Sequence, residues 1–186
     1  MPAPLIAKTE VLARLTREFL RWGYDGATLA RLSAATGLVK ASLYHYFPKG
    51  KQDMARAVLQ HLGETMERDL FQPLRWEPDP QKALREFVPG LIDFYRRGDV
   101  PCILQIFSFG TAAELFGETI RAFFRTLLDE LTGAQVRAGR EEGEAHGRAA
   151  RMLILIQGSL IVSRGLGDHS LFISTMETSQ RVLLQP

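Results

Sequence analysis

The chain has 186 residues, of which 46% are hydrophobic and 24% are charged, as is usual for one sizeable soluble domain or for a small module joined to a larger one. It holds a single cysteine, Cys102, which excludes an internal disulfide, a cysteine-based zinc site and an iron–sulfur cluster, and favours a reducing compartment. Nine Lys and Arg against four Asp and Glu give residues 1–60 a charge of +5, whereas fourteen against seventeen give residues 61–186 a charge of −3, so the basic third suggests a module that binds a polyanion.

The N-terminal segment MPAPLIAKTEVLARL lacks a basic stretch followed by a long apolar run, so we expect no signal peptide. The most apolar segment, MLILIQGSLIVS at residues 152–163, is short and interrupted for a bilayer span, which needs about 20 apolar residues. We therefore expect a cytoplasmic protein without a membrane partner.

The first predicted helix carries four large apolar residues on one face and ends at Gly23, where Tyr24-Asp25-Gly26 reads as a turn. The four residues that share this face are Leu12, Leu15, Phe19 and Trp22.

Two short helices follow. Thr28 can cap the first of them, because its hydroxyl can accept a hydrogen bond from an orphan backbone N–H. Gly37 can end this helix in a left-handed conformation, which costs glycine no Cβ clash. The next helix runs from about Val39 to Phe47, and Leu43 is one of its inward-facing residues.

A long helix is predicted from about Lys51 into the seventies, and the segment WEPDP at residues 76–80 forms the clearest boundary. The later helical patterns cover residues 80–97, 101–110, 112–138, 145–166 and 168–184. No strand-like alternation persists. The sequence therefore predicts an all-α protein with a helix-turn-helix domain at residues 1–50 and a helical domain at residues 51–186, whose residues 51–75 form a linking helix.

The segment GLVKASLYHYFPKGK, residues 37–51, contains two tyrosines, one histidine and three lysines but no acid. A helix that only packed would carry Leu or Ala at such positions, and a solvated helix would mix both signs of charge. In a helix-turn-helix unit the second helix of the pair lies in the DNA major groove, where a carboxylate would be repelled by phosphates. The segment therefore predicts a DNA-reading helix.

The residues expected to contact DNA fall into three groups. Lys40, Ala41 and Ser42 lie in the first turn of this helix, where side chains reach base edges. Tyr44, His45 and Tyr46 cover its exposed side and can donate hydrogen bonds to phosphate oxygens. The helix N-termini at Thr28 and near Lys51 add oriented N–H groups that suit phosphate.

Residues 8–60, and GLVKASLYHYFPKGK above all, resemble the DNA-binding domain of the TetR family of transcriptional regulators. The resemblance rests on Gly-Tyr-x-Gly-x-Thr at residues 23–28, on Ser-Leu-Tyr-His-Tyr-Phe-Pro at residues 42–48 and on the lysine at 51. It implies a homodimer that binds a palindromic operator through its N-terminal domain. A small molecule bound to the C-terminal domain would change the half-site spacing and release the DNA.

Two features depart from the family pattern. Val39 stands where the family often has Ser or Thr, so an oxygen that would cap the helix and touch a phosphate is missing. The loop Pro48-Lys49-Gly50-Lys51 is about one residue longer than the common form. Lys51 is our match for the family's lysine, and Lys49 is a possible substitute.

Simpler interpretations stay open for several of these residues. Tyr44 and Tyr46 could pack against the first helix, and His45 could be exposed without a role. Cys102 could be a small core residue rather than a reactive thiol. His61, His146 and His169 have no partners at metal-ligand spacing, and no nucleophile, acid–base pair or glycine-rich phosphate loop stands out, so we expect no metal, no cofactor and no enzymatic activity.

The resemblance also implies a ligand cavity, which we expect within residues 84–160. Ligand pockets usually combine aromatic walls with a few polar groups, although aromatic residues at helical spacing more often form a core. The residues expected to line the pocket are Phe94, Tyr95, Cys102, Ile106, Phe107, Phe109 and Gln157. Gln105 and Ser108 are further polar candidates.

The last two helices are expected to form the homodimer interface. MLILIQGSLIVS is apolar nearly all round, so a second face must be covered, and LFISTM and VLL in the last helix can supply the other half. The leading hypothesis is thus a ligand-responsive regulator that acts as a repressor, with double-stranded DNA and a small-molecule effector as partners. The alternative is an all-helical dimeric scaffold whose basic face is incidental.

Overall fold

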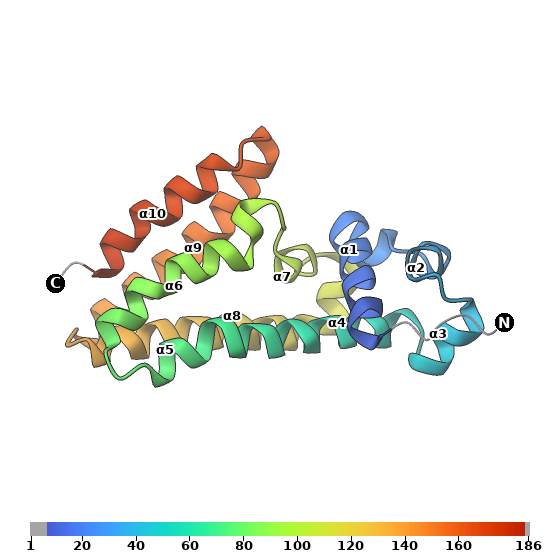
Figure 1. The fold of residues 1–186 in the computed structure, drawn as a ribbon, viewed down its shortest axis with the longest axis horizontal. Coiled ribbons are helices and arrows are strands. Elements are labelled where there is room, and N and C mark those ends of the chain that lie inside the picture. Colours follow the sequence, from blue (N-terminus) through green and yellow to red (C-terminus); the bar gives the residue numbers. More distant parts are fainter. Residues whose placement is uncertain (1–6, 185–186) are drawn as a thin grey trace. The chain divides into compact units, whose positions relative to one another are not determined.

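The computed structural model of the chain describes residues 7–184, and every regular element within them is a helix (Figure 1). The predicted all-α fold is thereby confirmed for this part of the chain. Residues 1–6, which the predicted first domain includes, lie outside the described residues. Contacts divide the chain into two compact units, Met1–Glu64 with Ile103–Ile120, and Thr65–Cys102 with Arg121–Pro186.

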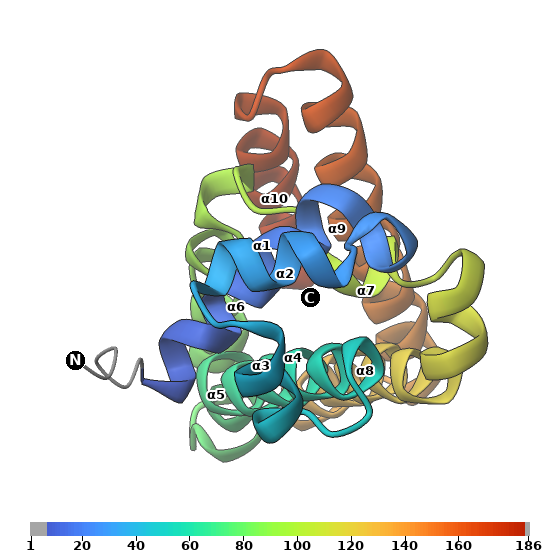
Figure 2. The ribbon, with the colours of Figure 1, turned by 90° about the vertical axis from the view of Figure 1, so that its right-hand side faces the viewer.

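The first unit begins with α1 (Lys8–Gly26), α2 (Leu29–Thr36), α3 (Lys40–Tyr46) and most of α4 (Lys51–Met66). Figure 2 shows α2 lying beside α1, with α3 following across a tight turn. The backbone of α1 breaks at Gly23, where φ is 64° and ψ is 179°, as its glycine predicts. The side chains that form the core of these helices are Val11, Leu12, Leu15, Phe19, Leu32, Leu43, Phe47, Met54 and Val58.

Local side-chain chemistry fixes both ends of α2. The Thr28 hydroxyl accepts a hydrogen bond from the backbone N–H of Arg31 at 3.3 Å, as a helix N-cap does. At the other end Gly37 takes the left-handed conformation with φ of 72°, and its N–H donates to the Ser33 carbonyl at 3.0 Å. The turn between α2 and α3 is therefore the one the sequence predicts.

A later segment of the chain completes the first unit. It contains α7 (Ile103–Ile106) and the first turns of α8 (Gly110–Arg137). Phe107 is fully buried, and its ring lies edge-on to Phe19 and Tyr24 at centroid distances of 5.5 and 6.0 Å. Because these aromatic contacts join 103–120 to α1, the units differ from a division into residues 1–50 and 51–186.

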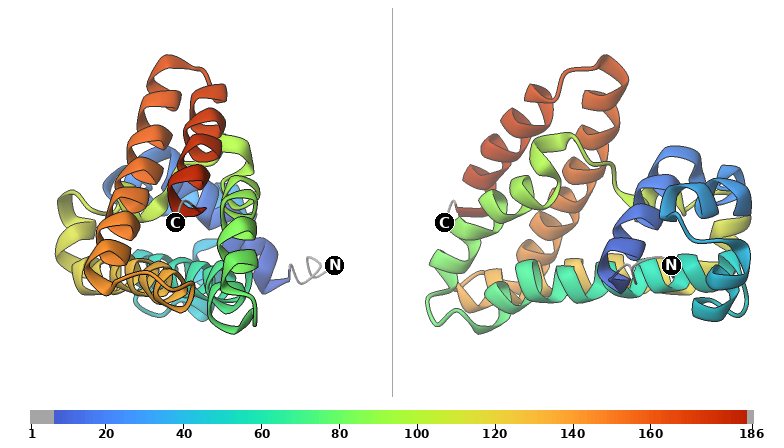
Figure 3. Two further views of the ribbon diagram at one scale, coloured as in Figure 1. Left: turned by 90° about the vertical axis from the view of Figure 1, so that its left-hand side faces the viewer. Right: turned by 45° about the vertical axis from the view of Figure 1, so that its right-hand side comes forward.

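The second unit consists of η1 (Glu67–Phe71), α5 (Gln72–Trp76), α6 (Pro80–Phe94), η2 (Arg96–Gly98), residues 121–137 of α8, α9 (Glu142–Leu166) and α10 (Ser170–Leu184). Figure 3 shows α10 packed alongside α9 and α6. The predicted boundary at WEPDP is present, because α5 ends at Trp76 and the Asp79 carboxylate caps α6 by accepting from the Gln81 N–H at 2.9 Å.

Two backbone features of the second unit differ from the regular helices that the sequence predicts. Glu67–Phe71 forms a π-helical turn between α4 and α5. After α6, Arg96 and Arg97 both take positive φ angles, 46° and 57°, which is uncommon for residues other than glycine. They end the helix that the pattern extended to residue 97.

Among the described residues, α9 has the length and the apolar composition of a helix that could cross a membrane. Of its most apolar 18-residue stretch, 33% is buried. Core helices of soluble proteins share this property. The sequence pattern predicts no span because it counts only residues 152–163 as apolar. Much of the apolar surface of α9 is left uncovered in this chain.

Candidate nucleic-acid interface

The nine residues predicted to contact DNA all lie in the first unit, between the start of α2 and the start of α4. Seven of them are exposed: Thr28, Lys40, Ala41, Tyr44, His45, Tyr46 and Lys49. Ser42 and Lys51 are half-buried. The structure therefore brings the whole predicted set onto neighbouring elements of one compact unit.

Helix α3 presents polar and cationic groups outward because two apolar residues hold its inner side. Leu43 and Phe47 are 1% and 4% exposed. The first turn of α3 contains no acid, and its N-cap residue, Val39, makes no side-chain hydrogen bond and is 67% exposed. The cap oxygen is thus absent in the structure, as the sequence indicates.

The loop after α3 fits closely around one tyrosine. Gly50 has a φ of 64°, and a Cβ built there would lie 3.2 Å from Cε1 of Tyr44. The Tyr44 ring therefore covers the loop while 45% of the residue stays exposed. Tyr46 is 41% exposed, and its ring lies edge-on to His45 at 5.8 Å.

The two lysines at the start of α4 have different surroundings. The backbone N–H of Lys49 donates to the Asp53 carboxylate at 2.7 Å, and the Lys49 side chain is exposed. The ammonium of Lys51 donates to the Tyr24 carbonyl at 2.9 Å and lies 4.4 Å from the centre of the Tyr24 ring. Lys51 therefore fastens α4 to the end of α1.

Sequence reasoning missed a cluster of arginines around Trp22. Trp22 shares a helical face with core residues in the sequence pattern, but it is 40% exposed. The guanidinium of Arg31 lies 4.0 Å from the centre of the Trp22 ring, and that of Arg21 lies 5.0 Å from it. In the sequence, the arginines at 21 and 31 on either side of Trp22 and the Gly23 break are the signal that could have indicated this cluster.

The residues predicted to line a ligand pocket are divided between the two units. Phe94, Tyr95, Cys102 and Gln157 belong to the second unit, whereas Ile106, Phe107 and Phe109 belong to the first. Phe107 is part of the aromatic core of the first unit, and Phe109 is 71% exposed.

A buried polar cluster in the second unit joins three of the predicted residues. The Tyr95 hydroxyl is hydrogen-bonded with the Cys102 thiol and the Gln157 amide, and the Tyr95 ring lies 6.0 Å from that of Phe172. Burial raises the pKa of Tyr95 well above its usual value, and Cys102 raises it further. Among the residues that the structure describes, the Oε1 atom of Gln157 is buried without a hydrogen-bond partner, so the cluster retains an unused acceptor.

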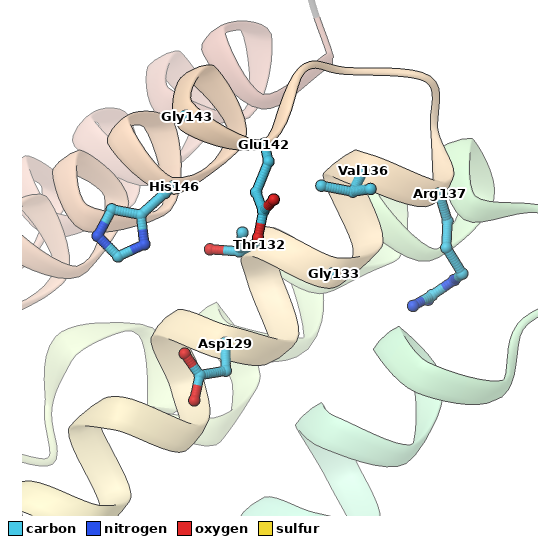
Figure 4. Close-up of a pocket in the computed structure, with 8 residues that line it drawn as sticks. All are labelled: Asp129, Thr132, Gly133, Val136, Arg137, Glu142, Gly143 and His146. Carbon is cyan, nitrogen blue, oxygen red and sulfur yellow. The ribbon is translucent and has the colours of Figure 1, made fainter.

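An open groove of about 740 Å³ lies between the end of α8 and the start of α9 (Figure 4). The side chains and backbone that line it belong to Asp129, Thr132, Gly133, Val136, Arg137, Glu142, Gly143 and His146. None of the predicted pocket residues is among them. Within residues 7–184, no group of three His, Cys, Asp or Glu side chains could hold a metal ion.

Comparison with known proteins points to one family. The model of the family described as "Bacterial regulatory proteins, tetR family" matches residues 11–58. An uncharacterized HTH-type transcriptional regulator, YxaF of Bacillus subtilis (strain 168), is 29% identical over 82 residues, which are 44% of this chain and 43% of that protein. The chain thus matches about half the length of this curated relative. An uncharacterized HTH-type regulator of Mycobacterium tuberculosis (strain ATCC 25618 / H37Rv) is 25% identical over 161 residues, or 84% of this chain and 81% of that protein.

Solved structures share the fold over nearly the whole chain. The crystal structure of a TetR transcriptional regulator from Legionella pneumophila has a TM-score of 0.79 at 17% identity and covers 98% of this chain and 99% of that one. The regulator CifR, solved as a cysteine mutant with 26-bp operator DNA, has a TM-score of 0.77 at 18% identity and covers 97% and 98% of the two chains.

Proposed function

We propose, from the premise that this chain belongs to the tetR family of bacterial regulatory proteins, that it is a DNA-binding transcriptional regulator. The observation that carries the proposal is the exposed, acid-free face of α3. A short helix held by Leu43 and Phe47 presents its cationic and hydroxyl groups to solvent, which is what a major-groove reader requires. The regulator CifR, whose structure is similar to this one, was solved in complex with double-stranded operator DNA.

The proposed contacts divide into base readers and phosphate ligands. Lys40, Ala41 and Ser42 would face base edges from the first turn of α3. The proposed phosphate ligands are Thr28, Tyr44, His45, Tyr46, Lys49 and Lys51. Lys51 remains in this set because an ammonium has three N–H donors, of which the Tyr24 carbonyl uses one.

A gel-shift assay with genomic fragments tests DNA binding directly. We expect the full chain to retard a subset of fragments and to lose affinity steeply as salt rises, since phosphate contacts release counterions. Lys40→Ala should cost about 1–3 kcal/mol of binding free energy and relax the preference for particular fragments. Equal retardation of all fragments by both proteins would contradict a sequence-specific regulator.

We further propose that the regulator is a homodimer in which α9 forms the interface. One stripe along α9 consists of the exposed residues Gly147, Ile154, Gly158, Ile161 and Gly165 and of the half-buried Ala150. Ile154 is 70% exposed and Ile161 is 49% exposed, and no side chain of residues 7–184 lies within 4 Å of a Cβ built at Gly158 or Gly165. Apolar knobs beside glycines suit close packing of a second, symmetry-related helix.

The outward face of α10, in contrast, is polar, with exposed Ser174, Glu177, Thr178 and Arg181. The predicted four-helix interface would therefore take most of its apolar area from α9 and a polar rim from α10. Such a division is common in interfaces, where an apolar centre is surrounded by polar groups.

An effector site in the second unit is proposed around Tyr95, Cys102 and Gln157. The unused Gln157 acceptor beside aromatic rings suits a small apolar or aromatic molecule that carries one hydrogen-bond donor. Such a ligand would release the DNA only if it binds the DNA-free conformation more tightly. Operator titration with and without candidate compounds, for wild type and for Gln157→Leu, tests this role as a repressor's effector site.

We place the regulator in the bacterial cytoplasm, where its DNA partner lies, and assign it no enzymatic role. A dimeric helical scaffold without DNA binding is the second candidate, and the apolar stripe of α9 favours it as much as it favours a regulator. The acid-free α3 separates the two, because a scaffold has no need of it.

A further inference from the structure

Trp22 and Arg31 form a stacked pair on the surface of the first unit. The guanidinium carbon of Arg31 lies 4.0 Å from the centre of the Trp22 ring, well within the range of a cation–π interaction. An NH1 group of Arg31 also donates to the Gly26 carbonyl at 2.9 Å. Two attachments therefore hold a long, otherwise mobile side chain in one place, although both residues are exposed.

The pair sits tightly against the turn that joins α1 to α2. A Cβ built at Gly26 would lie 3.3 Å from Cβ of Trp22, so the turn packs closely against the base of the Trp22 side chain. Trp22 is the last residue before the Gly23 break and stays 40% exposed, whereas Leu15 and Phe19 on the same helix are fully buried. The turn itself thus builds the platform on which Arg31 lies.

The position of Arg31 within α2 is electrostatically unfavourable in the isolated chain. Arg31 lies in the first turn of the helix, which contains no acid, and the helix dipole favours a negative charge at this end. Thr28, the proposed phosphate ligand, caps the same turn. A phosphate bound here would meet oriented N–H groups and the guanidinium together.

We infer that Trp22 is a positioning residue that holds Arg31 as an additional contact to the phosphate backbone of double-stranded DNA. The inference rests on the proposed function, because it takes α3 to lie in the major groove. In helix-turn-helix proteins the helix before the reader crosses the backbone, so the start of α2 meets a phosphate strand. Stacking covers one face of the guanidinium and leaves the edges of its planar fork available for phosphate oxygens.

The test measures the salt dependence of binding to a random-sequence duplex of roughly 30 base pairs, about three helical turns, by fluorescence anisotropy. Arg31→Gln should reduce the slope of log affinity against log salt by about one per DNA-binding head. Arg17→Gln removes the same charge from an exposed site on α1 where Glu10 is the neighbour, and it should leave the slope nearly unchanged. Melting temperatures of both variants should stay close to that of the wild type, because Arg31 and Arg17 are exposed and changes at exposed sites usually alter stability little.

Trp22→Leu and Trp22→Phe separate positioning from packing. Loss of the stack should weaken duplex binding about two- to fivefold in Trp22→Leu, and the aromatic Trp22→Phe should restore most of it. In the Arg31→Gln background the Trp22 change should have no further effect. An Arg31→Gln slope equal to the Arg17→Gln slope, or a Trp22 effect that persists without Arg31, would overturn the inference while leaving DNA binding intact. Failure of the wild type to bind any duplex at low salt would instead refute the proposed function.

Discussion

Lys51 shows how one side chain can serve both the fold and the proposed interface. Its ammonium is hydrogen-bonded to the Tyr24 carbonyl and lies over the Tyr24 ring. The same Tyr24 ring packs edge-on against Phe107 and Phe116. Lys51 therefore connects the start of α4 to the aromatic core of the first unit, while Lys49, two residues earlier, extends into solvent.

Replacing Lys51 by Met should lower the free energy of unfolding by about 1–2 kcal/mol, since a charge-assisted hydrogen bond and a cation–π contact are lost. Lys49→Met should change it by less than about 0.5 kcal/mol, as is usual for exposed sites. Urea unfolding of both variants measures the difference. Equal free energies of unfolding for Lys51→Met and Lys49→Met would show that the Tyr24 contact contributes little. Both variants should also lower the slope of log DNA affinity against log salt by about one unit.

The buried Tyr95 predicts a loss of stability in alkaline solution. Its pKa is raised in the folded state by burial and by Cys102, so the folded chain holds the phenol proton where the unfolded chain releases it. Stability should therefore fall as pH rises above the unfolded value, about 10. Unfolding by urea at several pH values should show a smaller alkaline loss for Tyr95→Phe than for wild type, and parallel curves would contradict this account.

Single residues were predictable where their chemistry was local. The acid-free run marks the exposed side of α3, and Thr28 and Gly37 mark the ends of α2. The stack of Trp22 on Arg31 and the aromatic partners of Phe107 could not be predicted, because periodicity does not give the direction of a side chain next to a break such as Gly23, nor its distant partners.

At the scale of helices, most boundaries follow from residues that cannot continue a helix or that cap one. The break at WEPDP and the turn at Gly37 are examples. The π-helical turn Glu67–Phe71 was missed because one extra residue per turn leaves the apolar pattern almost unchanged over so short a stretch. Arg75 bridges Glu67 and Glu130 across this turn, a contact between distant segments.

Gly37→Ala should destabilise the first unit by about 1 kcal/mol, because a side chain is strained at a φ of 72°. Gly37→Asn should cost less, since asparagine tolerates the left-handed region better. In the described part of the chain nothing lies within 4 Å of the added Cβ, so crowding does not contribute. Chemical unfolding measures the free energy of unfolding of the two variants. An alanine variant as stable as the asparagine variant would contradict a cost from backbone strain.

The uncovered stripe of α9 makes a direct prediction about assembly. Ile154→Asp should convert the protein to a monomer at micromolar concentration, since each buried isoleucine contributes about 1.5–3 kcal/mol and a two-fold interface loses two of them. Leu115→Asp, at a residue on α8 that is 40% exposed, is the matched control and should remain dimeric. Sedimentation of the wild type and of both variants measures their oligomeric states, and a monomeric wild type would refute the proposed dimer.

At the scale of the whole molecule, the division of the chain differs from its order in sequence. Ile103–Ile120 belongs with the N-terminal helices because Phe107 and Phe116 pack around Tyr24. The Asp25 carboxylate also accepts from the Thr111 N–H at 3.3 Å. The all-α class could be predicted from helical spacing throughout, whereas this grouping depends on contacts between segments that the pattern treats separately.

The central claim, a sequence-specific DNA-binding regulator, is tested most directly by selecting duplexes from a random pool with the full-length protein and sequencing those that bind. The account predicts an enriched inverted repeat whose half-sites lie about one helical turn apart, roughly 34–36 Å, or somewhat more. Lys40→Ala should select a broader pool because it lacks a base contact. A pool that stays random after repeated selection at moderate salt would contradict the claim.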